Sequence, residues 1–206
     1  MDDLLGRVRE LKGGDVGRIV DARMAEFSEN GRKPLDGLFR ELCFCLCTAN
    51  NSAERGLRAL DEIGDGFCSL PEPELRQKMR EVVCRFYNNK TEFVLEARGK
   101  MSSLDGILSM DGMAAREWLV GNIKGLGFKE ASHFLRNIGF KDVAIIDFHI
   151  IDLLVGEGLI ERPKSLTKKR YLEIEQVLDG IARELDVSLA ELDLYLWYLE
   201  TGKVLK

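Results

Sequence analysis

Apolar side chains recur at helical spacing along most of the chain. Ala131, Phe134, Leu135 and Ile138 occupy positions i, i+3, i+4 and i+7, which form one face of a helix. Only four of the 206 residues are proline, and with this periodicity the sequence predicts an all-α fold. The predicted helices cover residues 2–29 with a break at Gly13-Gly14, then 34–47, 53–63, 73–83, 91–98, 113–123, 128–138, 148–155 and 167–185, and a last helix follows a capping box at Ser188 and Glu191.

A pair of glycines separates two of these helices. Gly125 and Gly127 flank Leu126, and glycine is favoured where the backbone takes a positive φ or approaches another backbone closely. The pattern predicts two helices joined by a short turn, whose amides could bind a phosphate together with those of the next helix N-terminus. An ordinary glycine helix cap explains the same residues, so both interpretations stay open at this point.

Two charged residues follow the turn. Lys129 is predicted in the first turn of the second helix, where the helix dipole disfavours an ammonium and favours the neutral, nucleophilic amine. A solvated lysine or a phosphate contact is the alternative. Asp147 follows the apolar run 143–146 and precedes an apolar helix, so it is predicted as that helix's N-cap. A carboxylate held ionised there can also stabilise an oxocarbenium-like transition state.

These motifs resemble those of a known superfamily. IKGLGFKEA followed by IIDFHI resembles the helix-hairpin-helix DNA glycosylases that carry a Gly/Pro-rich loop and an aspartate. The lysine and the aspartate, at this spacing, resemble the pair found in the lyase-competent branch of this superfamily. From RELCFCLCTAN to LWYLETGKVLK, the chain resembles the compact, archaeal-type second family of 8-oxoguanine DNA glycosylase/AP lyases. One departure is Lys124, where many members carry proline, which changes the stiffness of the turn.

The resemblance implies a fold and a set of roles. It implies two helical lobes with the active-site cleft between them, a single unit over 1–206, and the helix-hairpin-helix at about 113–139. Lys129 and Asp147 would be catalytic, while Gly125, Gly127 and His133 would bind a DNA phosphate. A monovalent cation could be held by carbonyls of the hairpin. The partner would be double-stranded DNA containing 8-oxoguanine, bound by a monomer.

Further roles in base recognition follow from the same resemblance. Phe86, in RFYNNK, would be a stacking surface for the extruded purine, although an aromatic at helical spacing is more often in the core. Trp197 would face the damaged base, and Lys206 would help to read it. Asn51 is a candidate for filling the gap left in the DNA, and an ordinary turn is the alternative. His149 is expected to be structural.

Composition qualifies this interpretation. The net charge is −5, which is unusual for a nucleic-acid binder, but local potential decides phosphate contacts. No apolar run reaches the roughly 20 residues of a membrane span, and the N-terminus lacks a signal-peptide pattern, so a cytoplasmic location is expected. Two basic clusters stand out, and each could equally be a solvated surface: Lys124, Lys129, Arg136 and Lys141, and then Lys164, Lys168, Lys169 and Arg170.

All five cysteines lie in the first half of the chain. Three of them, Cys43, Cys45 and Cys47, fall inside an apolar helix, where small buried thiols are the favoured interpretation. The odd number argues against a disulfide framework. Some relatives in the superfamily hold an iron–sulfur cluster on C-terminal cysteines, and no cysteine follows Cys84, so we expect neither that cluster nor another metal site.

The predicted function is therefore a bifunctional DNA glycosylase/AP lyase that excises 8-oxoguanine through a lysine Schiff base and cleaves the strand by β-elimination. Two alternatives remain open. The same residues could act on another oxidised base. A non-catalytic DNA-binding protein could use the hairpin for phosphate contact alone, and such a protein has no need of Lys129 and Asp147 together.

Overall fold

The protein is built from helices, as the sequence predicts. The computed structural model describes residues 2–83 and 85–206, and no strand occurs within these ranges. The helices are α1 (Asp2–Gly13), α2 (Asp15–Asn30), α3 (Leu35–Thr48), α4 (Ala53–Ile63), α5 (Gly66–Ser69), α6 (Glu72–Val82), α7 (Tyr87–Arg98), the 3-10 helix η1 (Met101–Ser103), α8 (Leu104–Ile107), α9 (Gly112–Asn122), α10 (Phe128–Asn137), α11 (Phe148–Gly156), α12 (Lys168–Leu185) and α13 (Leu189–Thr201).

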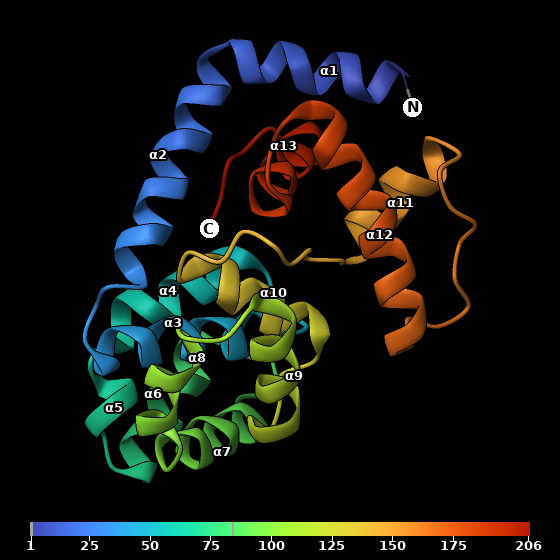
Figure 1. Cartoon of the computed structure of the whole chain (residues 1–206). Coiled ribbons are helices and arrows are strands. Elements are labelled where there is room, and N and C mark those ends of the chain that lie inside the picture. The colour runs from blue at the N-terminus through green and yellow to red at the C-terminus, as the bar shows by residue number, and fades with distance from the viewer. Residues whose placement is uncertain (1, 84) are drawn as a thin grey trace.

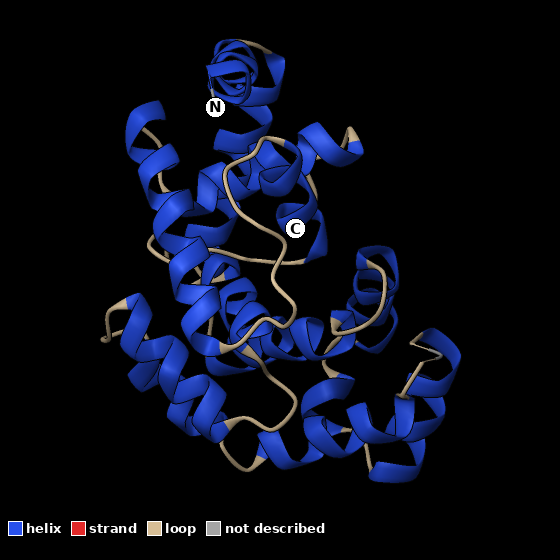
Figure 2. Ribbon diagram, turned by 90° about the vertical axis from the view of Figure 1, so that its right-hand side faces the viewer, coloured by secondary structure: helices blue, strands red, loops and turns tan. Residues whose placement is uncertain are grey.

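The helices form two lobes, each with its own apolar core (Figure 1). One core gathers side chains from α3 to α10, and the other gathers side chains from α1, α2, α11, α12 and α13. Residues 138–147 have no helical structure and cross from α10 to α11 between the lobes, as both views show (Figures 1 and 2). The expected two-lobed, all-α architecture is confirmed, and the chain crosses between the lobes just before Asp147.

Capping side chains set the starts of several helices. The N-cap side chains of α4, α9, α11, α12 and α13 each accept the amide of the third residue that follows. The capping box predicted at the start of α13 is present in full. Such caps satisfy amides that have no partner within the helix, so they fix where each helix begins. These N-caps are Ser52, Asp111, Asp147, Thr167 and Ser188.

Two regions differ from the sequence prediction. Helix α7 begins at Tyr87 rather than at residue 91, because Phe86 takes a left-handed conformation, with φ of 54°, and starts the helix early. Residues 99–112, predicted as a loop, include η1 and α8, and α5 was not predicted at all. Each of these elements has only three or four residues, which is too short to show a helical period.

Helix α3 runs through the core of the first lobe. Cys43, Cys45 and Cys47 are fully buried there, which confirms the prediction of thiols packed inside an apolar helix. Cys68 is partly exposed, and the prediction for Cys84 lies outside the described residues. Because three successive turns of α3 are buried, this helix forms a rigid floor beneath the C-terminal end of the chain, as described below.

The two glycines of the hairpin have different backbone conformations. Gly125 has a φ of +91°, which L side chains rarely adopt, and a Cβ placed on it would lie 2.3 Å from the Phe93 ring of α7. Gly127 has an ordinary φ of −91° and serves as the N-cap of α10 without a side-chain hydrogen bond. Gly125 therefore requires glycine, whereas Gly127 leaves the first amides of α10 uncovered by a side-chain cap.

We expect Gly125→Ala to destabilise the fold by about 1–3 kcal/mol, since a side chain there meets both an unfavourable φ and Phe93. The measurement is the free energy of unfolding in urea, followed by circular dichroism. Gly121→Ala is the matched control, because Gly121 is helical in α9 and has open space around it. We expect that variant to be unchanged or stabilised by about 0.5–1 kcal/mol. Equal stabilities of the two variants would contradict the explanation.

Candidate active site

A cavity of about 390 Å³ lies between the two lobes, within the size range of small-molecule sites, roughly 300–1,000 Å³. Residues from four parts of the chain line it: Thr48, Asn51, Ser52, Ala53 and Glu54 near α3 and α4; Lys129, His133 and Arg136 on α10; Ile145, Asp147, Phe148 and His149 at the start of α11; and Asp193, Trp197, Thr201, Leu205 and Lys206 on α13 and the segment after it. Both lobes therefore contribute to one chamber.

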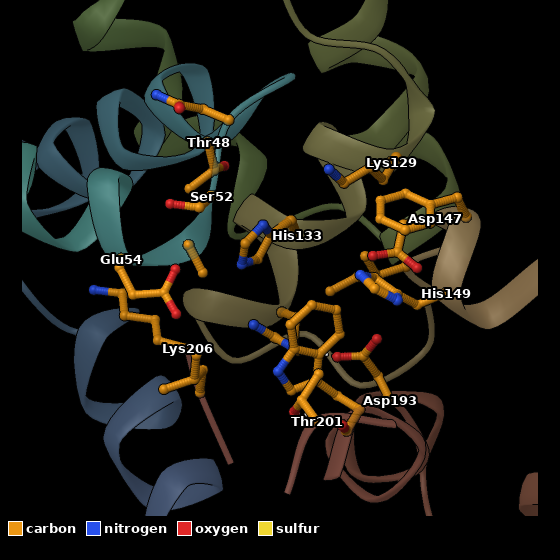
Figure 3. A pocket seen from close by; sticks show the side chains of 17 residues that line it. Thr48, Ser52, Glu54, Lys129, His133, Asp147, His149, Asp193, Thr201 and Lys206 are labelled. Atoms are coloured by element: carbon orange, nitrogen blue, oxygen red, sulfur yellow. Dashed lines mark hydrogen bonds and ion pairs between the residues drawn. The ribbon is translucent and has the colours of Figure 1, made fainter. Parts of the chain in front are cut away.

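Lys129 reaches this chamber from the first turn of α10. Its side chain is 30% exposed, and Nζ lies 3.5 Å from Oε1 of Glu130. Figure 3 shows Lys129 on the same side of the cavity as Asp147, with Thr48 and Ser52 on the opposite side. Lys129 therefore remains accessible, and its ion pair with Glu130 is close to solvent, where such pairs are weak.

Asp147 is the N-cap of α11, as predicted. Its Oδ1 accepts the amide of Ile150 at 3.0 Å, and the side chain lines the same cavity as Lys129. This hydrogen bond fixes the orientation of the carboxylate at the start of α11. A lysine and a fixed carboxylate, separated along the chain, thus meet at one chamber large enough for a ligand.

His133, expected to bind a DNA phosphate, is a buried residue of α10. It is 9% exposed, and its ring packs edge-on against Phe44 at 5.4 Å between centroids. Burial lowers its pKa well below the usual value, and the charges of Arg136 and Lys129 lower it further. The histidine is therefore neutral at pH 7. The structure places it in the wall of the chamber, and the phosphate contact expected of it stays a prediction.

Asp193 is a residue of the site that was not predicted from the sequence. This carboxylate of α13 lines the chamber and forms an ion pair with Arg136 of α10. Burial raises the pKa of Asp193 to about 6, with Arg136 opposing the rise and Asp147 adding to it. Arg136 is 4% exposed, so its predicted place in a basic phosphate-binding cluster is wrong. In the sequence, Asp193 is one acidic residue in an otherwise apolar helix, which is the signal that could have identified it.

Aromatic rings form part of the chamber wall. Trp197 lines it, and the His149 ring meets the indole edge-on at 5.0 Å between centroids. His149 in turn lies 3.9 Å from the Phe148 ring centroid, and Phe148 is 65% exposed. His149, expected to be structural, is therefore part of the site. The three rings give the chamber a continuous apolar side that ends at the solvent.

The side chain of Lys206 is anchored behind the chamber. Its Nζ donates to Oε1 of Glu41 on α3 at 2.6 Å and lies 5.1 Å from the centroid of the Phe44 ring. Glu41 is 4% exposed, so the pair is almost excluded from water. This anchor holds the segment after α13 against α3, and Leu205 and Lys206 complete the wall near His133.

Phe86 lies outside the chamber that contains Lys129. It is 55% exposed and lines a second cavity of about 240 Å³ next to Gly125 and Asn50. Its exposure rules out the alternative that Phe86 is a core residue, and its role in stacking on the base stays a prediction. Asn51 does line the first chamber, but its amide already donates to the carbonyl of Val83 at 3.0 Å. The residue beside it, Asn50, is exposed and takes a left-handed conformation.

A second buried amine lies near this cavity. Lys90 of α7 is 3% exposed, and its Nζ donates to the carbonyls of Cys47 and Ala49 at 2.6 and 2.7 Å. Burial lowers its pKa to about 8, so this amine is more easily neutralised than an ordinary lysine. Because it caps the C-terminal end of α3 with two hydrogen bonds, it is held in place. Lys129 has no such backbone partner among the described residues.

No helix in the described part of the chain is both long enough and apolar enough to span a membrane. No group of three or more His, Cys, Asp or Glu side chains within residues 2–83 and 85–206 is arranged to hold a metal ion.

The fold and the chamber define a helix-hairpin-helix protein with a lysine and a carboxylate facing one cavity between two lobes. A family model described as 8-oxoguanine DNA glycosylase matches residues 20–187. The chain belongs to this 8-oxoguanine DNA glycosylase family. It is 53% identical, over 100% of its length and 99% of the relative's, to an 8-oxoguanine DNA glycosylase/AP lyase of Korarchaeum cryptofilum.

Solved structures agree with this assignment. The chain matches the Methanocaldococcus jannaschii 8-oxoguanine glycosylase/lyase in complex with a 15mer DNA containing 8-oxoguanine, with a TM-score of 0.95 and 48% identity. The match covers 98% of this chain and 99% of that one. The Thermotoga maritima 8-oxoguanine DNA glycosylase matches with a TM-score of 0.94 and 44% identity, over 100% and 99% of the two chains.

The depressed pKa of His133 predicts a pH-dependent stability. Below about pH 6.5 the unfolded chain protonates this histidine while the folded protein does not, so folding loses up to about 1.4 kcal/mol per pH unit until the folded pKa is reached. Urea unfolding at about pH 7 and about pH 5 measures this loss. We expect His133→Asn to lose less stability than the wild type over this range. An identical pH dependence would contradict burial of a neutral histidine.

Proposed function

We propose that this protein excises 8-oxoguanine from double-stranded DNA and then cleaves the strand at the abasic site, with Lys129 as nucleophile and Asp147 as the stabilising carboxylate. The observation that carries the proposal is that both side chains line one chamber between the lobes. The names of the relatives described above support the substrate and both activities. A DNA-binding protein without catalysis has no use for this juxtaposition.

Binding begins at the hairpin in this proposal. The amides near Gly125 and Gly127 and the uncapped start of α10 contact a backbone phosphate, which positions the DNA without reading its sequence. Lys129 follows directly in the first turn of the same helix. Holding a phosphate at this turn therefore places a nearby sugar close to the amine. The monovalent cation suggested for the hairpin stays a prediction, and no step here depends on it.

The lesion nucleotide must leave the duplex to reach the chamber, at a cost of a few kcal/mol. The neutral amine of Lys129 then forms a bond from Nζ to C1′ as the bond from C1′ to N9 of the base breaks. The electron pair leaves with the base, which takes up a proton. Asp147 stabilises the positive charge that develops on the sugar, and because its carboxylate is already fixed by the Ile150 amide, little reorganisation is needed.

Strand cleavage follows from the same bond. Opening of the sugar ring converts the Lys129 adduct into a protonated Schiff base between Nζ and C1′. This cation acidifies the proton on C2′, and its removal expels the 3′ phosphate by β-elimination. Hydrolysis then frees Lys129. Lys129 thus serves both activities, whereas Asp147 is needed chiefly for breaking the glycosidic bond.

The chamber wall offers groups that suit a guanine derivative. The indole of Trp197 supplies a flat surface for the purine. Asp193, with a pKa of about 6, is mostly ionised at pH 7 and can accept hydrogen bonds from N1–H and the 2-amino group. 8-Oxoguanine differs from guanine by an N7–H donor and a C8 oxygen. We assign its discrimination to the wall near His133 and Lys206, where the side chain of Lys206 anchors the chain.

Phe86 is better placed to contact the DNA duplex than the extruded base. It is exposed in the second cavity, beside Asn50 and the hairpin glycine Gly125. We therefore propose that Phe86 and Asn50, rather than Asn51, occupy the space that the extruded nucleotide leaves. The amide of Asn51 is held by Val83 and supports this turn from within.

Borohydride trapping tests the catalytic assignment. Reduction of a Schiff base on an 8-oxoguanine duplex should give a covalent protein–DNA adduct, and Lys129→Ala should lower its yield by at least about 100-fold, because the other lysine that lines the chamber, Lys206, is held in an ion pair with Glu41. Lys78→Ala on α6, whose amine donates to the carbonyl of Glu62, is the control and should form the adduct normally. An adduct that persists in Lys129→Ala but disappears in Lys90→Arg would reassign the nucleophile.

Lys206→Ala tests base discrimination. Removing the anchor should free the segment after α13, so we expect the ratio of kcat/KM for 8-oxoguanine over guanine to fall about tenfold, equivalent to about 1.4 kcal/mol. The Kd for the same DNA should change much less, because Lys206 belongs to the chamber wall and not to the hairpin that is proposed to bind the phosphate. Equal losses in discrimination and in DNA affinity would refute this role.

A further inference from the structure

A buried polar network connects the two lobes behind the chamber. Arg116 of α9 is 1% exposed, and its guanidinium donates to both carboxylate oxygens of Glu175 on α12, at 2.6 and 2.7 Å. The same guanidinium donates to Oγ of Ser132 on α10 at 3.2 Å. None of these three side chains lines the chamber, so the network has no direct contact with the proposed substrate.

The network ends on the backbone segment that leads to Asp147. Oε1 of Glu175 accepts the amide of Ala144 at 2.8 Å. The hydroxyl of Tyr171 donates to the carbonyl of Ala144 at 2.7 Å and accepts the amide of Ile146 at 3.2 Å. Three backbone groups of residues 144–146 are thus held by side chains of α12. This segment is neither helix nor strand, so regular secondary structure does not fix it.

The same hydroxyl is close to the helix that carries Lys129. It lies 3.4 Å from Oγ of Ser132, three residues after the lysine. The Tyr171 ring packs against Phe128, the residue before Lys129, at 5.4 Å between centroids. Tyr171 itself is 2% exposed. One buried side chain therefore contacts both the start of α10 and the peptide that immediately precedes Asp147.

We propose that Tyr171 is a positioning residue for the glycosylase step: its hydroxyl fixes the 144–146 segment and so sets where the Asp147 carboxylate stands relative to the sugar. This inference rests on the proposed role of Asp147. A displacement of about 1 Å in a reacting group can lower a rate by about 100-fold. The effect of the Tyr171 hydroxyl should appear in the chemical step, since this hydroxyl bonds neither residues 125–127 of the hairpin nor any residue that lines the chamber.

Tyr171→Phe is the direct test, because it removes two hydrogen bonds to the segment and keeps the ring packing against Phe128. Base excision is measured under single-turnover conditions with saturating enzyme on an 8-oxoguanine duplex. We expect the rate to fall at least about tenfold, with the Kd for an uncleavable abasic-site analogue unchanged. Trapping with borohydride on a preformed abasic site should fall less than base excision, because Asp147 serves chiefly the earlier step.

Tyr195→Phe is the matched control. Tyr195 is 3% exposed in the core of the same lobe, and its hydroxyl has no part in the network described here, so base excision should stay within about twofold of wild type. Hydrogen exchange of the Ile146 amide gives an independent readout. This amide should lose protection in Tyr171→Phe and keep it in Tyr195→Phe.

Asp147→Asn distinguishes the proposed catalytic role of Asp147 from the proposed positioning role of Tyr171. Loss of base excision in Asp147→Asn and in Tyr171→Phe supports both the catalytic role and the positioning role. Loss in Asp147→Asn with a normal rate in Tyr171→Phe overturns the positioning role alone. A normal rate in Asp147→Asn overturns the catalytic role of that carboxylate. If Tyr171→Phe no longer unfolds cooperatively, or if DNA affinity falls as much as the rate, the hydroxyl serves the whole fold and the positioning role is refuted.

Discussion

The ion pair between Arg116 and Glu175 is the interaction on which the arrangement of the site depends. It joins α9 of one lobe to α12 of the other, with both oxygens of the carboxylate engaged. A buried pair of this kind adds little net stability, but removing one partner costs about 3–5 kcal/mol because a buried charge is left without a counterpart. The pair therefore specifies one relative placement of the lobes more than it strengthens their association.

The proposed function requires that specificity because the residues assigned to the reaction and to base binding come from different elements. Lys129 stands on α10, Asp147 begins α11, and Asp193 and Trp197 stand on α13. Neither apolar core contains the chamber, which exists only where the lobes meet. A small rotation of one lobe would preserve both cores and still separate the amine from the carboxylate. The polar links between the lobes, including Arg136 with Asp193, oppose such a rotation.

Much of this architecture follows from local rules that the sequence shows. Asp147 was predicted as an N-cap and Ser188 as part of a capping box because a short polar side chain just before a helix can accept its unpaired amides, and the structure confirms both. Lys129 and Asp147 were selected from their spacing and from the resemblance. Their common cavity could not be read from the sequence, because it depends on how the two lobes pack.

The errors have a common physical origin. His133 and Arg136 look solvent-facing in the sequence, yet helix packing buries them both, and Arg136 is tolerated there because Asp193 neutralises it. A core position was the alternative left open for Phe86, but the residue takes a left-handed backbone conformation just before α7 and is exposed. Whether such residues are buried or exposed depends on packing partners that are distant in the sequence. The helical periodicity of a segment carries no information about those partners.

The close approach of Gly125 to Phe93 has a mechanical consequence. The hairpin backbone rests directly on the ring of a residue in α7, and α7 is the helix that Phe86 precedes. The turn that would grip one DNA strand and the aromatic side chain that would probe the duplex therefore share a single rigid support. A displacement of the hairpin turn would be transmitted through Phe93 and α7 to Phe86, and the reverse would also hold. Binding of the DNA phosphate and distortion of the duplex would therefore be mechanically coupled.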